Sequence, residues 1–239
     1  MSPLSALAAA NADHAAQLAS RPVLLLVAVV ALSLLPFLLL LMTSFVKIAV
    51  VLAILKSALG AAQIPPSQVV TGLALILTIY VMAPTGERMY RAVEPELARG
   101  AGTELLSGQG ALALVQAADK AKEPMREFLL RHASGRDRGV FAALALRLRT
   151  GDARASVTDR DFLVLVPAFL ASELRRAFEI GFLVFIPFLV VDLVIANLLV
   201  ALGMSMLSPT TVSLPFKLLL FVLADGWQLL LRGLVESYV

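Results

Sequence analysis

Residues 23–42 read VLLLVAVVALSLLPFLLLLM, an apolar run that only Ser33 and Pro36 interrupt. A helix needs about 20 mostly apolar residues to cross the roughly 30 Å hydrocarbon core of a bilayer. The run has this length, so it predicts a helix built for a membrane. No other feature of the sequence restricts the fold as strongly.

The composition agrees with a membrane protein. Of the 239 residues, 59% are hydrophobic and 15% are charged, whereas about a quarter of a soluble domain is charged. The chain has no cysteine, which excludes disulfides and cysteine-based metal or redox sites. Its net charge of +3 indicates membrane topology rather than nucleic-acid binding.

The distribution of charge divides the chain into four parts. Residues 88–160 hold most of the charge, whereas apolar runs such as 69–83 and 182–202 lie on either side. We therefore expect an all-α, integral-membrane-type fold of helical hairpins with a small helical extracytoplasmic region. The parts are an N-terminal segment (1–21), a first hydrophobic hairpin (22–87), the polar region (88–160) and a second hydrophobic hairpin (161–239).

Helical periodicity within the polar region predicts two short amphipathic helices. Thr158 and Asp161 have the spacing of a capping box that opens the next helix. The expected apolar faces consist of Met125, Phe128, Leu129 and His132 in one helix, and of Phe141, Leu144 and Leu148 in the other.

Three lysines predict the topology. Lys47 and Lys56 are the ionisable residues between the first two apolar blocks, and Lys217 lies between the last two. If both connections are basic tips, the positive-inside rule places them in the cytoplasm. Region 88–160 and both termini would then lie outside.

Two carboxylates fall inside apolar runs, where a charge costs roughly 2.5–3.5 kcal/mol on insertion scales. In an antiparallel hairpin of the last two runs, Asp192 and Asp225 would lie at similar depth. Three roles are open: pairing with basic residues such as Arg175 or Arg176 or with a neighbouring copy, contact with water or backbone groups, and proton transport.

The joint ALGMSMLSPTTVSLPFKLLL (201–220) separates these runs. Gly203 and Pro209 predict a turn, and Pro187 predicts a kink in the preceding run. We expect the next helix to begin at Leu214 and Pro215, with caps from Thr210, Thr211 and Ser213. Met204 and Met206 are either core filler or a soft apolar closure.

Motifs that would indicate catalysis are missing from the sequence. It has no P-loop, HExxH or nucleophile triad pattern, and His14 and His132 stand alone. We therefore expect no catalytic, cofactor-binding or metal site, and no enzyme.

Two blocks of the sequence resemble the R subunit of the type III secretion export gate (SctR), whose flagellar counterpart is FliP. The blocks are residues 35–84 and 166–234. They contain, in order, TSF-x-[KR]-I, SEL-x-x-AF-x-IGF, IPFL-x-x-D, ALGM and LPFKL-x-LFVL-x-DGW. Residues 88–160 match weakly.

The resemblance implies a ring-shaped pore of five copies, completed by S and T subunits, through which unfolded secreted polypeptides pass. It also implies contact with other inner-membrane export proteins and no binding of nucleic acid. The protein would lie in the bacterial inner membrane, with part of the assembly on the periplasmic side. In the family a methionine-rich gasket follows the ALG sequence. The matching positions are Met204, Ser205 and Met206, where Ser205 replaces the usual methionine and Leu207 compensates for it.

Family members are of two types, secretion and flagellar, and the sequence favours one of them. Residues 1–20 do not read as the cleavable signal peptide common in flagellar members, which favours the secretion (injectisome) type. The alternatives are a flagellar paralogue, or a small-solute transporter that uses Asp192 and Asp225. Expected intramembrane or inter-subunit charges are Lys47, Arg175, Glu179, Asp192, Lys217 and Asp225, and expected turns or kinks are Gly203, Pro209, Pro187 and Pro215.

Overall fold

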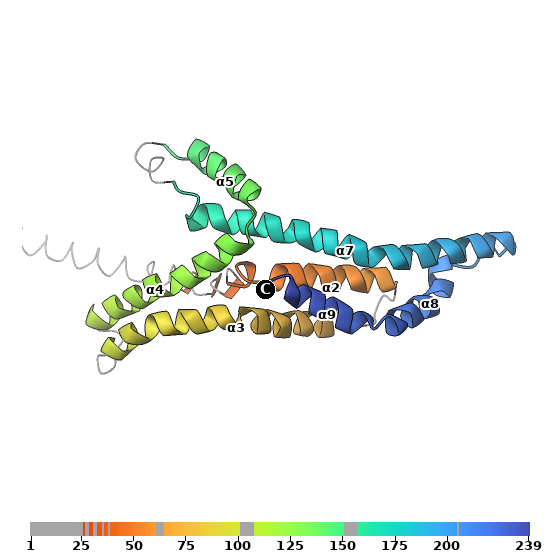
Figure 1. The fold of residues 1–239 in the computed structure, drawn as a ribbon, viewed down its shortest axis with the longest axis horizontal. Coiled ribbons are helices and arrows are strands. Elements are labelled where there is room, and N and C mark those ends of the chain that lie inside the picture. Colours follow the sequence, from red (N-terminus) through yellow and green to blue (C-terminus); the bar gives the residue numbers. More distant parts are fainter. Residues whose placement is uncertain are drawn as a thin grey trace, which may run out of the picture. The chain divides into compact units, whose positions relative to one another are not determined.

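The fold is all-helical throughout the part of the chain that the computed structural model describes (Figure 1). This part comprises residues 39–60, 65–100, 108–150, 157–204 and 206–239, together with single positions between 26 and 37. The chain divides into two compact units, Met1–Leu41 and Met42–Val239.

The first unit contains the apolar run on which the membrane prediction was based. Its described positions are helical, and those up to residue 39, such as Leu26 and Phe37, are exposed. Residues 1–22 and nine of the residues 23–42 lie outside the described residues.

The second unit consists of helices that pack largely side by side. Their order is α2 (Phe45–Leu59), α3 (Ser67–Gly100), α4 (Gly108–His132), α5 (Gly135–Leu148), α7 (Phe162–Ala201), α8 (Pro209–Leu223) and α9 (Gly226–Glu236).

Helix α2 is the centre of the core. It lies between α7 on one side and α3 and α9 on the other (Figure 1). The sequence of α2 is strongly apolar. The helix is terminated by Gly60, whose φ of 75° only glycine adopts at no steric cost. The buried residues recur at helical spacing: Lys47, Ile48, Val51, Leu52, Leu55, Ala58 and Leu59.

The polar region begins inside a helix. The change in composition predicted that the polar region begins at residue 88, but helix α3 continues across this position. It contains Pro84 and Pro95. Helix α4 packs against α3 and α7. The predicted face of α4 is confirmed, because Met125, Phe128, Leu129 and His132 are all buried.

The predicted apolar face of α5 is confirmed only at Phe141, which is half-buried against the core. Leu148 is 84% exposed, whereas Asp137 and Ala145 are the buried residues of α5. Phe141 lies between these two at a spacing of four residues, and α5 packs against α7. The buried face differs from the predicted one because it holds a hydrogen-bonded carboxylate, described below, which a hydrophobic pattern cannot register.

Helices α3 and α7 are long and apolar enough to cross a membrane, over Ser67–Pro95 and Phe162–Ala201. The pair α8 and α9 passes the same test together, but the two helices meet at 61°. Helix α7 extends beyond the end of α2, where α8 packs beside it (Figure 1). We call the part of α7 from residue 182 onward, together with α8, the arm.

Candidate functional site

The joint between α7 and α8 forms the end of the arm. Gly203 has a φ of 71°, which confirms the predicted turn. The expected helix start at Leu214 is wrong, because α8 already begins at Pro209 after the N-cap Ser208. Proline suits this first position since it lacks the amide hydrogen that a first turn leaves unpaired. Pro215 therefore lies inside α8, as Pro187 lies inside α7.

The apolar side chains of this joint are exposed. Met204 is 47% exposed, Met206 99% and Leu207 51%. Ser205, the fourth predicted gasket residue, lies outside the described residues. Flexible thioether side chains at the end of an arm can adapt to a partner, because methionine is unbranched and polarizable.

A polar cluster sits at the base of the arm. The Lys217 Nζ donates to Asp192 Oδ2 at 2.6 Å and to the Ala58 carbonyl of α2 at 3.1 Å. The Ser213 hydroxyl donates to the other Asp192 oxygen at 2.5 Å. Lys217 is only 2% exposed. We call these four residues the arm anchor.

The arm anchor bears on several expectations. Asp192 does pair with a basic residue, as one of the three open roles required, but the partner is Lys217 rather than Arg175 or Arg176. Asp225 is exposed and precedes α9 with a left-handed φ of 49°. Thr210, Thr211 and Ser213 are not caps but belong to the first turns of α8. The prediction that the lysines lie in basic connections is also wrong in part. Lys47 and Lys217 lie inside α2 and α8, where each is buried in an ion pair.

A second polar cluster lies in the core. The Lys47 ammonium is 3.5 Å from Glu173 Oε2 and 3.5 Å from the centre of the Tyr238 ring. The Tyr238 hydroxyl donates to Glu173, whose other oxygen accepts from Arg176 at 3.1 Å. Both Lys47 and Glu173 are fully buried. Burial, followed by the Glu173 charge, raises the pKa of Tyr238, so its hydroxyl stays protonated.

His132 borders this cluster. Its ring contacts the rings of Phe128 and Tyr238. Burial, and then the positive charges of Lys47, Arg176 and Arg131, lower the pKa of His132 to about 4. The imidazole is therefore neutral at physiological pH.

The remaining predicted charges lie farther along α7. The Ser172 hydroxyl, 2.6 Å away, holds the pKa of Asp137 below its usual range, with help from Ser134 and Arg175. Arg175 donates to Asp137 at 2.6 Å, so it is bound to α5 and not to Asp192. Glu179 is exposed, and no ion pair to it is found within the described residues.

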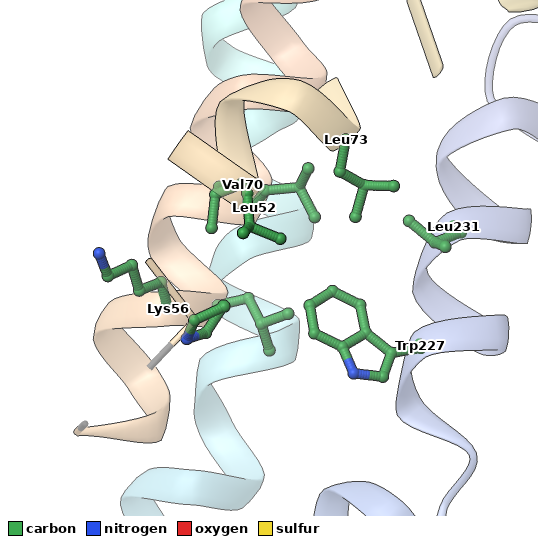
Figure 2. Close-up of a pocket in the computed structure, with 9 residues that line it drawn as sticks. Leu52, Lys56, Val70, Leu73, Trp227 and Leu231 are labelled. Carbon is green, nitrogen blue, oxygen red and sulfur yellow. The ribbon is translucent and has the colours of Figure 1, made fainter. Parts of the chain in front are cut away.

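An apolar pocket of about 260 Å³ lies between α2, α3 and α9 (Figure 2). Trp227 of α9 faces Leu52 of α2 across it. Lys56 contributes its aliphatic stem, while its ammonium donates to Ser67 at 2.7 Å. Without converging polar groups, the pocket is not built to orient a polar substrate.

Sequence reasoning missed several residues of the two clusters. Glu173 and Tyr238 carried no distinguishing pattern, because their partners are remote in the sequence. Ser213 had a usable signal: Ser213, Lys217 and Phe221 recur every four residues, which puts two polar groups on one face of a helix.

Comparison with known proteins identifies the family. The model of the FliP family matches residues 28–234 of the chain. The chain belongs to the FliP family. Both predicted resemblance blocks lie entirely within the matched region, as do the arm anchor and residues 203–208 at the end of the arm, which we call the tip.

Relatives in the FliP family include secretion and flagellar proteins. The hypersensitivity response secretion protein HrcR of Ralstonia nicotianae is 46% identical over 90% of this chain and 96% of its own length. The Yop proteins translocation protein R of Yersinia pestis is 44% identical over 90% and 95%. The flagellar biosynthetic protein FliP of Pectobacterium carotovorum is 46% identical over 89% and 77%. These names agree with the predicted secretion export-gate subunit.

Proposed function

We propose that the chain is a pore-forming subunit of a type III protein-export gate in the bacterial inner membrane, and that residues 203–208 seal the closed pore. Family membership supports the export role. The observation that carries the seal is the exposure of Met204, Met206 and Leu207 at the end of an apolar arm. The chain would act as a conduit and not as a catalyst.

A ring of these tips would close a pore in a reversible way. Copies whose methionines meet at an axis would make an apolar constriction, which excludes water and ions by dewetting. An unfolded polypeptide could pass because thioether side chains rearrange around it. Ser205 would make this layer less apolar than three consecutive methionines.

The rest of the arm supports assembly. Its large apolar side chains, such as Leu193 and Val222, are 56% and 72% exposed. A ring of five copies with S and T subunits would cover them, with the polar helices on the periplasmic side. Glu179 and Asp225 are exposed and offer charges to neighbouring subunits, whereas Asp192 and Lys217 are already paired within the chain.

Replacing both tip methionines tests the seal. In cells that assemble the complete export apparatus, M204A/M206A should raise the leakage of small ions while substrate proteins are still secreted. The cause is a wider and less apolar constriction. If M204A/M206A assembles as the wild type does and leaks no more ions than the wild type, the proposed sealing role is refuted. The matched control is L148A, which trims a side chain that is 84% exposed on α5 and should change neither readout.

We propose the secretion type rather than the flagellar type. The stretch LSPTTVSLPFK (207–217) supports this choice, because it resembles the injectisome version of the joint. The chain is nevertheless 46% identical both to HrcR and to a flagellar FliP, so a flagellar role is the second candidate. Expression in two deletion strains decides between them. Restored effector secretion without restored swimming supports the secretion type, and the reverse supports the flagellar one.

A further inference from the structure

Helix α8 is held to the rest of the chain by a narrow stripe. Its buried residues are Ser213, Lys217 and Phe221, spaced four apart on one face. Two of these three are polar, and both bind Asp192 of α7. The position of α8 therefore depends on directional contacts more than on apolar packing.

The arm anchor brackets the tip. Asp192 precedes Met204 by twelve residues, and Lys217 follows Met206 by eleven. At about 1.5 Å per residue, the anchor lies about 12–14 Å along the helices from Ala201, where α7 ends, and from Pro209, where α8 begins. Because the two helices are clamped together at this point, a small rotation at the anchor becomes a larger displacement of the methionines.

Lys217 also connects the arm to the core. Its ammonium donates to the carbonyl of Ala58, in the last turn of α2. Carbonyls in a last helical turn lack intrahelical partners, and a positive charge there is favourable. Helix α2 is the most buried helix of the core, so this bond ties the arm to a fixed element.

We propose that Lys217 is a positioning residue for the gate: by joining Asp192 and Ser213 of the arm to Ala58 of α2, it fixes where the methionine tip stands relative to the core. The consequence for sealing rests on the function proposed above. The geometric part does not, since it concerns one chain.

The geometric part can be measured by distances between spin labels. The chain has no cysteine, so labels at S57C near the end of α2 and at T211C in α8 are unique. Both sites are exposed. The full chain is studied in mild detergent, diluted with unlabelled chain so that only distances within one chain are recorded. The distance distribution should be narrow, and K217M should broaden it.

Two further variants complete the test. S213A removes one bond to Asp192 and should broaden the distribution less than K217M does. The control K120M removes an exposed lysine of α4 and should leave it narrow. A folded K217M with the wild-type distribution would overturn the proposal. If K217M does not fold, an unchanged distribution in S213A would overturn it.

Ion leakage then separates the two proposals. K217M in the assembled apparatus should leak as M204A/M206A does, although its tip is intact. If M204A/M206A leaks but K217M neither leaks nor broadens the distribution, the positioning role is wrong and the seal stands. If K217M broadens the distribution but M204A/M206A does not leak, the seal is wrong and the positioning role stands.

Discussion

At the scale of single residues, the buried charges of Lys47 and Glu173 in the core stabilise each other. Lys47 and Glu173 are fully buried, and Tyr238 contacts both. A buried charge is tolerated only when a partner and hydrogen bonds replace its water shell. The pair therefore connects α2, α7 and the residues after α9, but each member requires the other.

Removing one member should be costly. E173Q should lower the free energy of unfolding by about 3–5 kcal/mol, because Lys47 is left as an uncompensated buried charge. The measurement is the thermal unfolding midpoint in mild detergent. The double variant K47M/E173Q removes both charges and should recover most of the loss. Equal instability of the single and the double variant would contradict this account.

His132 makes stability depend on pH. Its pKa is about 4 in the fold against 6.5 for an unperturbed histidine. Between these values the unfolded chain binds a proton and the folded chain does not, so acidification favours unfolding. The loss should begin as the pH falls below 6.5, level off near 4, and reach about 1–3 kcal/mol.

Unfolding midpoints measured from neutral to acidic pH test the role of His132. H132Q should flatten the profile over this window, since glutamine does not titrate. The chain has one other histidine, so H14Q is the matched control and should keep the wild-type slope. If the unfolding midpoint of H132Q still falls steeply with pH over this window, groups other than His132 cause the pH dependence.

At the scale of elements, the contact between α2 and α7 depends on Gly181. A Cβ built at Gly181 would lie 2.3 Å from Ile54 Cδ1 and 3.2 Å from its Cβ. The rotatable methyl group can move, but the Ile54 Cβ is fixed to the backbone of α2. The two helices approach this closely only because position 181 carries no side chain.

G181A should therefore destabilise the fold by about 1–3 kcal/mol, the usual cost of overpacking. G72A is the control, because a Cβ at Gly72 in α3 meets nothing within 4 Å. It should stabilise the helix by about 0.5–1 kcal/mol through lower backbone entropy in the unfolded chain. Unfolding midpoints in detergent measure the stability of both variants. If G181A is as stable as G72A, the close approach of α2 to α7 at Gly181 is refuted.

Local sequence patterns predicted the elements better than their contacts. The apolar face of α4 and the turn at Gly203 follow from periodicity and from glycine chemistry, and both were found. The start of α8 was misplaced because two prolines in the joint could each begin a helix. The bond from Lys217 to Ala58 in the arm anchor could not be predicted, since the two residues lie 159 positions apart and periodicity carries no long-range information.

At the scale of the whole molecule, the chain leaves much apolar surface uncovered. In the second half of α7, the exposed side chains include Phe182 at 66%, Leu183 at 68% and Val200 at 74%. Contiguous apolar surface of this kind marks contact with lipid or with other subunits. The single chain is thus a building block whose arm is completed by its surroundings.

If copies surround a common axis, their tips must be close together. M206C places the only cysteine of the chain at a site that is 99% exposed. Mild oxidation of the assembled complex should give disulfide-linked dimers, because one cysteine per chain allows no larger product. A ring of five would leave at least one copy unlinked. L148C, 84% exposed on α5, is the control and should remain monomeric. Dimers from L148C but not from M206C would place α5, rather than the methionine tip, at the axis.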